Sequence, residues 1–173
     1  GEKGPSKERI FSIYEPHAEL IMRGKRKSPC EFGHSIWVSQ TREKFITDHD
    51  VMERKIADAD LTETIVDRHR DIFGRYPDVL AADQGFRGTA EKMQRVERKV
   101  KNTAIPKRLS DWADSMMPLW QSFRAGVEGS ISVLKRAFRL AVCQYRGFKS
   151  FAASIGMGIV CHNLVNLAGL EPD

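Results

Sequence analysis

Residues 124–140 read RAGVEGSISVLKRAFRL, and this stretch combines a helical pattern with an unusual placement of charge. Apolar side chains recur every three or four positions, which predicts a helix with one buried face; they are Phe123, Val127, Ile131, Leu134 and Phe138. A neighbouring face carries Arg124, Glu128, Ser132, Lys135 and Arg139. Glu128 is therefore the lone carboxylate within a basic stripe.

Two interpretations of Glu128 fit this pattern. The first is a solvated helix face on which Arg124 and Glu128 form a weak, exposed ion pair. The second is a carboxylate that holds a metal ion while the basic side chains around it hold a polyphosphate backbone. The stretch alone favours the first interpretation, and a second acidic segment upstream favours the other.

The bulk composition is that of a soluble globular protein. The chain has 173 residues, of which 41% are hydrophobic and 29% charged, enough for one domain with a core. The net charge of +5 is compatible with a polyanionic partner without requiring one. The three cysteines are far apart and form no CxxC pair, which favours reduced thiols in the cytoplasm over disulfides or a zinc site. Residues 1–9 are polar and do not resemble a signal peptide.

The order of the predicted elements indicates an α/β fold. Residues 1–8 are expected to be a flexible lead-in and residues 9–173 a single domain. Early strands that precede alternating strands and helices favour a sheet covered by helices. The predicted strands are 9–14, 32–40, 44–51, 78–82 and 103–106, and the predicted helices are 60–74, 89–100, a region from Ser110 broken near Pro118, the Glu128 helix and 151–170.

Two of these helices carry further expectations. Asp60 is expected to cap the start of the helix at 60–74 and Gly74 to end it. The closing run 151–170 is long and apolar enough to suggest a membrane span. Its polar residues Ser154, His162 and Asn163 would be costly in lipid, so a buried helix of a soluble domain is the better interpretation.

Asp83 stands where the apolar segment 78–82 ends and a turn containing Gly85 and Gly88 begins. Ligands gather at the carboxyl ends of strands in open α/β sheets. Asp83 is equally well explained as a cap for the next helix or as an acceptor for the amides of its own turn. Carboxylates on separate elements can, however, hold divalent metals about 3.5–4 Å apart, which activate a nucleophile and stabilise the leaving oxygen at phosphorus. That chemistry usually needs a third carboxylate.

Several segments resemble the bacterial insertion-sequence transposases of the DDE class. Residues 83–88 (DQGFRG) look like the second-Asp segment of these enzymes, and residues 124–136 look like their glutamate helix, with Lys135 at the place of a basic residue two turns later. Residues 145–148 (YRGF) leading to 162–164 (HNL) are similar to their closing helix. Residues 10–17, 23–25 and 31–33 resemble the segment before the second strand in one branch, so the likeness covers nearly the whole chain.

The resemblance implies a fold, a cofactor and partners. The fold would be ribonuclease-H-like: a mixed sheet with three antiparallel strands and then parallel strands, flanked by helices. The cofactor would be Mg²⁺ or Mn²⁺, and the reaction DNA strand cleavage and transfer. Transposon ends and target DNA would be the partners, with homo-oligomers formed on DNA. Asp83 and Glu128 take the catalytic and metal-binding places.

The sequence departs from the family pattern at the first carboxylate. The family places its first Asp ahead of a segment like residues 10–25, and here no Asp precedes Asp48. Either the chain starts after that Asp, which we prefer, or Glu15 replaces it as a metal ligand. Without a third ligand the chain would bind metal weakly and cut poorly, so an inactive remnant that only binds DNA or oligomerises is the alternative. Asp48, Asp50 and Asp58 are expected to be solvated loop carboxylates.

Basic side chains are the expected phosphate contacts, although each is equally well explained as a solubilising surface residue. These residues are Arg124, Lys135, Arg136, Arg139, Lys107, Arg108, Arg146 and Lys149. His17 and His34 are expected to form local hydrogen bonds, and His162 and the tryptophans to pack in the interior.

Overall fold

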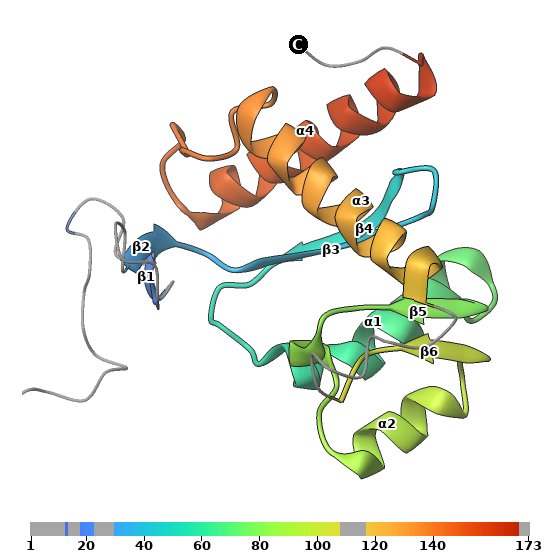
Figure 1. Cartoon of the computed structure of the whole chain (residues 1–173). Coiled ribbons are helices and arrows are strands. Elements are labelled where there is room, and N and C mark those ends of the chain that lie inside the picture. The colour runs from blue at the N-terminus through green and yellow to red at the C-terminus, as the bar shows by residue number, and fades with distance from the viewer. Residues whose placement is uncertain (1–12, 14–17, 23–29, 108–116, 170–173) are drawn as a thin grey trace, which may run out of the picture. The chain divides into compact units, whose positions relative to one another are not determined.

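The computed structural model describes residues 13, 18–22, 30–107 and 117–169, and these form an α/β protein (Figure 1). Two compact units are present: residues 1–38, 49–55 and 134–173 belong to the first, and residues 39–48 and 56–133 to the second. The elements are β1 (Glu19–Met22), β2 (Cys30–Gly33), β3 (Ile36–Gln40), β4 (Ile46–Val51), α1 (Asp58–Phe73), β5 (Val79–Ala81), η2 (Gln84–Phe86), α2 (Ala90–Glu97), β6 (Asn102–Ala104), α3 (Met117–Arg136) and α4 (Phe148–Leu167).

The second unit has a small apolar core between α1, α2 and a parallel strand pair. Val66 of α1 packs with Val96 and Val100, and Tyr76 and Leu80 cover this cluster. Strands β5 and β6 pair in parallel, with Leu80 opposite Thr103 (Figure 1). The parallel pairing agrees with the strand–helix–strand pattern of the sequence. The short apolar run at 78–82 favours a buried central strand, but this is wrong: Val79 is exposed, and Leu80 and Ala81 are only half-buried.

Helix α1 ends as predicted but begins differently. Gly74 follows its last residue with a left-handed φ of 72°, a conformation that glycine adopts without a steric penalty. The helix starts at Asp58 and its N-cap is Ala57, so the expected cap at Asp60 is wrong. Asp60 lies in the first turn and forms an ion pair with Lys92 of α2. An acidic residue in the first turn remains favourable because it faces the positive end of the helix dipole.

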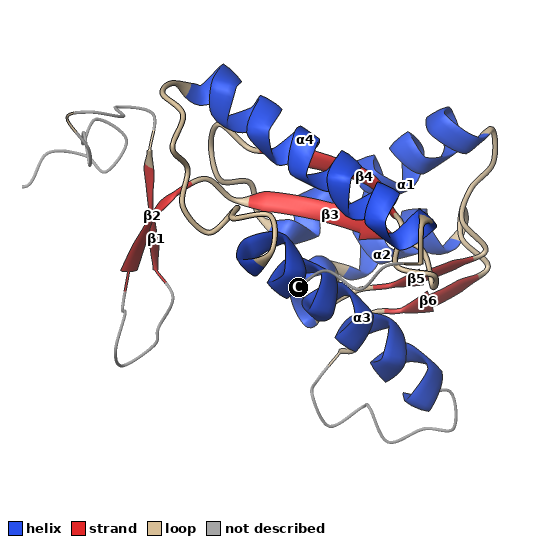
Figure 2. Cartoon of the chain, turned by 90° about the horizontal axis from the view of Figure 1, so that it is seen from above, coloured by secondary structure: helices blue, strands red, loops and turns tan. Residues whose placement is uncertain are grey.

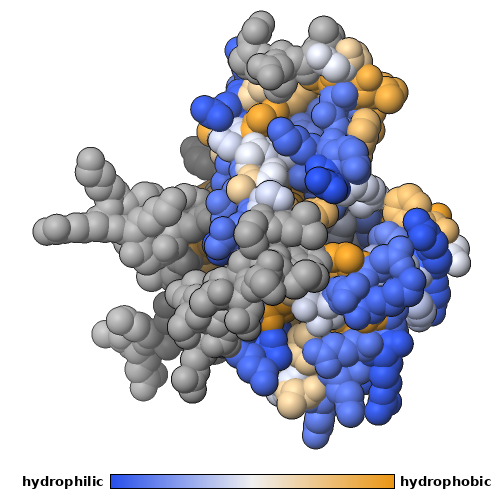
Figure 3. All heavy atoms as spheres, turned by 45° about the vertical axis from the view of Figure 1, so that its right-hand side comes forward, coloured by the Kyte–Doolittle hydropathy of each residue, from blue (hydrophilic) through white to orange (hydrophobic). Residues whose placement is uncertain are grey.

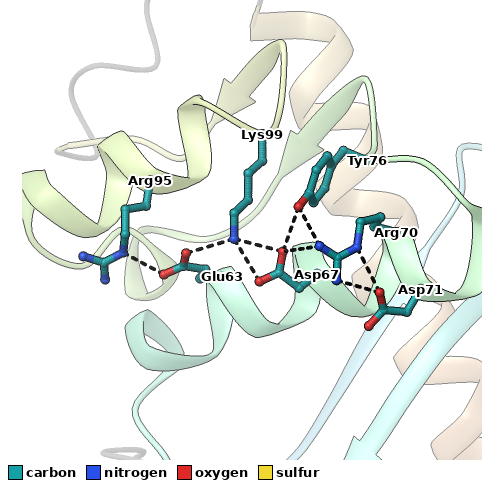
Figure 4. A network of polar contacts seen from close by, with 7 residues as sticks. All are labelled: Glu63, Asp67, Arg70, Asp71, Tyr76, Arg95 and Lys99. Carbon is teal, nitrogen blue, oxygen red and sulfur yellow. Dashed lines mark hydrogen bonds and ion pairs between the residues drawn. The ribbon is translucent and has the colours of Figure 1, made fainter.

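A chain of charged side chains joins α1 to α2 (Figure 4). The carboxylate of Glu63 accepts hydrogen bonds from Arg95 Nε at 2.8 Å and from Lys99 Nζ at 2.9 Å. Lys99 also donates to Asp67. These two donors lower the pKa of Glu63 below its usual value. Burial alone would lower the pKa of Lys99, but its hydrogen bonds with Asp67 and Glu63 raise it.

The solvent side of α2 is hydrophilic. Helix α2 lies in the lower part of Figure 1, and the lower part of the surface shown in Figure 3 is mostly hydrophilic. Met93 and Val96 of this helix are buried. Thr89 caps its start by accepting a hydrogen bond from the amide of Lys92. The helix is therefore amphipathic, with its apolar side against α1.

The predicted strand 32–40 is two strands. Strand β2 ends at Gly33 and β3 begins at Ile36, with the buried His34 between them. His34 Nδ1 lies 2.9 Å from the carbonyl oxygen of Met52. Strands β3 and β4 pair as neighbours, and the turn between them is closed by a hydrogen bond from the Thr41 amide to the Phe45 carbonyl.

Helix α3 is shorter at its C-terminus than the periodicity suggests. It ends at Arg136, so Phe138 and Arg139 lie beyond it and Arg139 adopts a left-handed φ of 54°. The predicted helical face through residue 140 is wrong for these two positions, because the chain turns back and the Leu140 amide bonds the Leu134 carbonyl. Pro118 falls in the first turn of α3 and does not break it, since amides there need no helical acceptor.

The first unit contains an antiparallel pair and the closing helix. Strand β1, which the sequence did not predict, pairs with β2, and the Glu19 carboxylate accepts a hydrogen bond from the Lys55 amide. Gly147 precedes α4 with a left-handed φ of 80°. Ile155, Gly158, Ile159 and His162 of α4 are buried, and Met157, Val160, Leu164 and Leu167 are exposed.

By length and composition α4 is also able to cross a membrane, but one such helix is weak support for a span. Only 17% of the most apolar 18-residue window of α4 is buried. The helix is therefore less buried than the sequence led us to expect.

The described strands form three separate two-stranded sheets, β1–β2, β3–β4 and β5–β6 (Figure 2). The expected single mixed sheet is therefore not seen in the described part of the chain. The predicted strand 9–14 lies outside the described residues except for Ile13, which is an exposed bend.

Candidate metal and DNA site

Asp83 follows β5 directly and precedes the short turn η2. Its carbonyl accepts a hydrogen bond from the Phe86 amide, but its side chain makes no capping hydrogen bond. Thr89, and not Asp83, caps the next helix. Both structural explanations offered by the sequence, a helix cap and a bond to the turn's own amides, are therefore wrong, and the carboxylate is available for other partners.

The turn after Asp83 is fixed from three sides. The hydroxyl of Thr62, a buried residue of α1, donates to the Phe86 carbonyl at 2.6 Å. Arg87 donates to the Ile105 carbonyl, and Gln84 Nε2 donates to the Lys107 carbonyl at 2.9 Å. A side chain at Gly85 would bring its Cβ to 3.1 Å from the Asp58 carboxylate. Asp83 is thus presented by a well-held loop, and sequence reasoning missed Thr62 and Arg87 because their contacts are long-range.

Glu128 lies in the middle of α3 with its side chain 65% exposed. Arg124 lies one turn earlier on the same helix. The Nε atom of Arg124 lies 3.3 Å from Oε1 of Glu128 and 2.7 Å from Oδ1 of Asp83. One guanidinium nitrogen therefore joins the carboxylate that follows β5 to the carboxylate of α3.

The two predicted carboxylates consequently lie close together. Since both oxygens contact the same nitrogen, they are at most about 6 Å apart, a span that ligands of a metal pair about 3.5–4 Å apart can cover. Both side chains are more than half exposed, so solvent reaches this position. Asp83 and Glu128 can supply two carboxylate ligands to a hydrated Mg²⁺ ion, which retains several waters in protein sites.

The third carboxylate is not supplied by the described residues. No group of three or more His, Cys, Asp or Glu side chains that could hold a metal is found within residues 18–22, 30–107 and 117–169. Glu15 lies outside the described residues.

The other acidic residues considered have different roles. Asp48 is not a solvated loop residue: it lies in β4 and pairs with Arg68 at 2.7 Å, with its side chain 11% exposed. Asp50 accepts a hydrogen bond from the Val51 amide within the same strand. Asp58 begins α1 and is exposed, with its carboxylate near Gly85. The expectation of solvated loop carboxylates is therefore wrong for Asp48, which is mostly buried in an ion pair; Asp50 and Asp58 are exposed as expected, although Asp50 lies in a strand.

Arg124 is the only predicted phosphate contact that pairs with a carboxylate in the described part of the chain. Lys135 and Arg136 form the exposed last turn of α3, and Lys135 follows Glu128 by seven residues along that helix. Arg108 lies outside the described residues, and Lys107, Arg139, Arg146 and Lys149 are exposed.

Of the histidines and tryptophans for which the sequence made a prediction, His34, His162 and Trp37 are described and all three are buried. His34 stacks edge-on with Phe148 at 5.0 Å between ring centroids, and His162 is buried near Phe138. The burial of His162 and Trp37 agrees with their expected packing roles. The hydrogen-bond partner of His34, in contrast, is the Met52 carbonyl 18 residues away, and so is not the local partner expected. His17 and Trp112 lie outside the described residues, and nothing is described of the Trp120 side chain.

Comparison with known families gives one match. A family model described as "Transposase DDE domain" matches residues 34–164. The match covers both Asp83 and Glu128 and most of the chain. No curated protein and no solved structure matched the chain.

Proposed function

Because this chain belongs to the family of transposase DDE domains, we propose that it is a transposase catalytic domain that cleaves DNA strands and transfers them with divalent metal ions. Family membership supports a role in transposition and DNA recombination. The observation that carries the finer proposal is the convergence of Asp83 and Glu128 on one cationic nitrogen.

The geometry supports metal-dependent phosphoryl transfer in three ways. Asp83 is held at the carboxyl end of a parallel strand, Glu128 lies on a later helix, and both face one solvent-accessible position. Mg²⁺ or Mn²⁺ bound there would activate the attacking hydroxyl or water and stabilise the leaving 3′-oxygen. Asp83 and Glu128 would fix the positions of the cations, because the turn after β5 holds Asp83 in place and the backbone of α3 holds Glu128. DNA phosphates would be held by the neighbouring basic side chains.

The proposal includes a ribonuclease-H-like fold. Its support is the order of elements: the β3–β4 hairpin, then α1, then β5 with an aspartate at its end, then the parallel β6 and a glutamate helix. The described residues supply no third carboxylate; Glu15 and an acidic residue outside residues 1–173 are the two candidates that the assay below separates.

DNA is the proposed partner, both as transposon end and as target, and homo-oligomers would form on it. The proposed phosphate contacts are Arg124, Lys135, Arg136, Arg139, Lys107, Arg108 and Arg146. Action on chromosomal DNA would place the protein in the bacterial cytoplasm.

A nicking and strand-transfer assay with Mn²⁺ tests the proposal. The chain, a version extended upstream, and Asp83→Asn and Glu128→Gln variants of each would be compared. We expect cleavage in the extended protein and its loss, by at least about a hundredfold, in either variant, because each removes a metal-ligand charge. Asp71→Asn is the matched control, since Asp71 is an exposed carboxylate of α1 paired with Arg70. Full activity of the Asp83→Asn enzyme would refute the assignment.

A second candidate is a non-catalytic module that binds DNA. The observation in its favour is that the described residues bring together two candidate ligands and no third. This alternative predicts that neither the 173-residue chain nor the version extended upstream cleaves DNA, while both bind it. Cleavage by the short chain that disappears on Glu15→Ala would instead make Glu15 the third ligand.

A further inference from the structure

Arg124 occupies the place between the two proposed metal ligands. A helix places residues four apart on one face, so a contact between Arg124 and Glu128 needs no special explanation. The contact with Asp83 does, because it is the shorter of the two at 2.7 Å and joins a different element of the fold. Both contacts are made by the same atom, Nε. A single positive charge thus lies where two carboxylates converge.

We propose that the guanidinium of Arg124 acts as a stand-in cation: it occupies the metal position while no metal is bound and is displaced when a divalent ion binds. This inference rests on the proposed function, since it takes Asp83 and Glu128 as the metal ligands. The released guanidinium is then free to bind a DNA phosphate. Arg124 would therefore couple metal binding to DNA binding.

The physical basis is competition between two cations for the same oxygens. A bound Mg²⁺ ion takes its oxygen ligands at about 2.0–2.1 Å, and a guanidinium held between the same carboxylates would be repelled by its charge. Displacement costs little, because the Arg124 side chain is 44% exposed and exposed ion pairs are weak. Without any cation, Asp83 and Glu128 would repel each other across the short gap. The arginine thus keeps the two ligands together and also competes for them.

Two consequences follow from this competition. In the absence of DNA, Arg124 lowers the affinity of the chain for divalent metal. A DNA phosphate that draws the guanidinium away removes the competitor, so DNA raises metal affinity, and by linkage metal raises DNA affinity by the same factor.

The first test is a titration with Mn²⁺ in the absence of DNA, with the free ion measured by its electron paramagnetic resonance signal. We expect Arg124→Ala to bind Mn²⁺ about three- to tenfold more tightly than the wild type, a modest gain because the displaced ion pairs are exposed. Arg98→Ala is the control: Arg98 is an exposed arginine at the C-terminal end of α2, without a carboxylate partner among the described residues. It removes the same charge from a different place and should change the affinity by less than about twofold.

Asp83→Asn separates failure of this inference from failure of the proposed function. If Asp83→Asn leaves Mn²⁺ affinity unchanged, the carboxylate pair is not the metal site and the proposed function fails. If Asp83→Asn weakens binding but Arg124→Ala does not strengthen it, the metal site stands and the stand-in role is refuted. Equal gains in Arg124→Ala and Arg98→Ala would also refute it, because they would reflect net charge alone.

The second test measures coupling to DNA. A short duplex should raise the Mn²⁺ affinity of the wild type about threefold or more, and the gain should disappear in Arg124→Ala. A gain of equal size in both proteins would contradict the role of Arg124, since the coupling would then pass through other groups.

Discussion

At the scale of single residues, the candidate site combines a fixed support with adaptable side chains. Thr62 holds the Asp83 turn from the buried side of α1. Asp83, Arg124 and Glu128 themselves are exposed, so their contacts can rearrange at little cost in stability. A fixed backbone with exposed side chains suits the proposed exchange of the Arg124 guanidinium for a metal ion, because the exchange needs no movement of the backbone.

Gly129, next to Glu128, provides a test of the backbone of α3. A glycine inside a helix costs roughly 0.5–1 kcal/mol relative to alanine. A Cβ at Gly129 would meet no atom within 4 Å, so Gly129→Ala should raise the free energy of unfolding by about that amount. Urea denaturation followed by circular dichroism measures the change.

Gly126 of the same helix is the matched comparison. Its added Cβ would lie 3.4 Å from Gln40 Nε2, a contact at the tight edge of the ordinary range, so Gly126→Ala should stabilise less than Gly129→Ala. A loss of stability in Gly129→Ala would show that α3 does not have the open surface described at that position.

The sequence predicted the two carboxylates but not what joins them. Glu128 is marked by its place in a basic helical stripe, and Asp83 by its place at a strand end. The pairing of Arg124 with Glu128 follows from helical spacing, whereas its shorter contact with Asp83 depends on where α3 lies relative to the turn that follows β5. Such long-range contacts leave no periodic signal in a single sequence. The same reason explains why Thr62 and Arg87 were missed.

At the scale of elements, local signals located the helices better than their ends. Gly74 ends α1 as predicted, since a left-handed position has a clear residue preference. The predicted start of α1 and the predicted end of α3 were wrong. Neither position carries a strong boundary signal, and tertiary contacts decide where such helices begin and end. Strand β1 was missed because only four residues form it.

The charge network between α1 and α2 makes a prediction about pH. Hydrogen bonds from Arg95 and Lys99 lower the pKa of Glu63, so Glu63 stabilises the fold above its unfolded-state pKa. That stability is lost as the pH falls through the lowered folded-state pKa. The free-energy gap between the wild type and Glu63→Gln should be about 0.5–1 kcal/mol at pH 7 and should close as the pH falls well below 4.5.

Urea denaturation at pH values from 7 down to 3 measures this gap. Glu97→Gln is the control, because Glu97 is an exposed carboxylate of α2 without an ion pair among the described residues. A gap between the wild type and Glu63→Gln that stays constant over the whole range would show that the loss of charge at Glu63 is not its cause.

At the scale of the whole molecule, the net charge of +5 does not say how many side chains bind DNA. The salt dependence of binding does, because each neutralised phosphate releases counterions. If all seven proposed contacts bind phosphates, the slope of log K against log salt should approach about −6. A much shallower slope would mean that most of these basic residues serve solubility.

Lys135 gives this idea a test at one position. It is exposed in the last turn of α3, on the same helix as Glu128. Lys135→Ala should weaken binding similarly on all duplex sequences and reduce the salt slope by about one, since phosphate contacts carry no base information. Lys101→Ala removes an equal charge from a lysine paired with Asp78 and should leave the slope unchanged. Fluorescence anisotropy across a salt series measures both. If the two variants lower affinity equally and neither alters the slope, the effect of Lys135 is one of net charge, and the DNA contacts must be sought among the other basic residues.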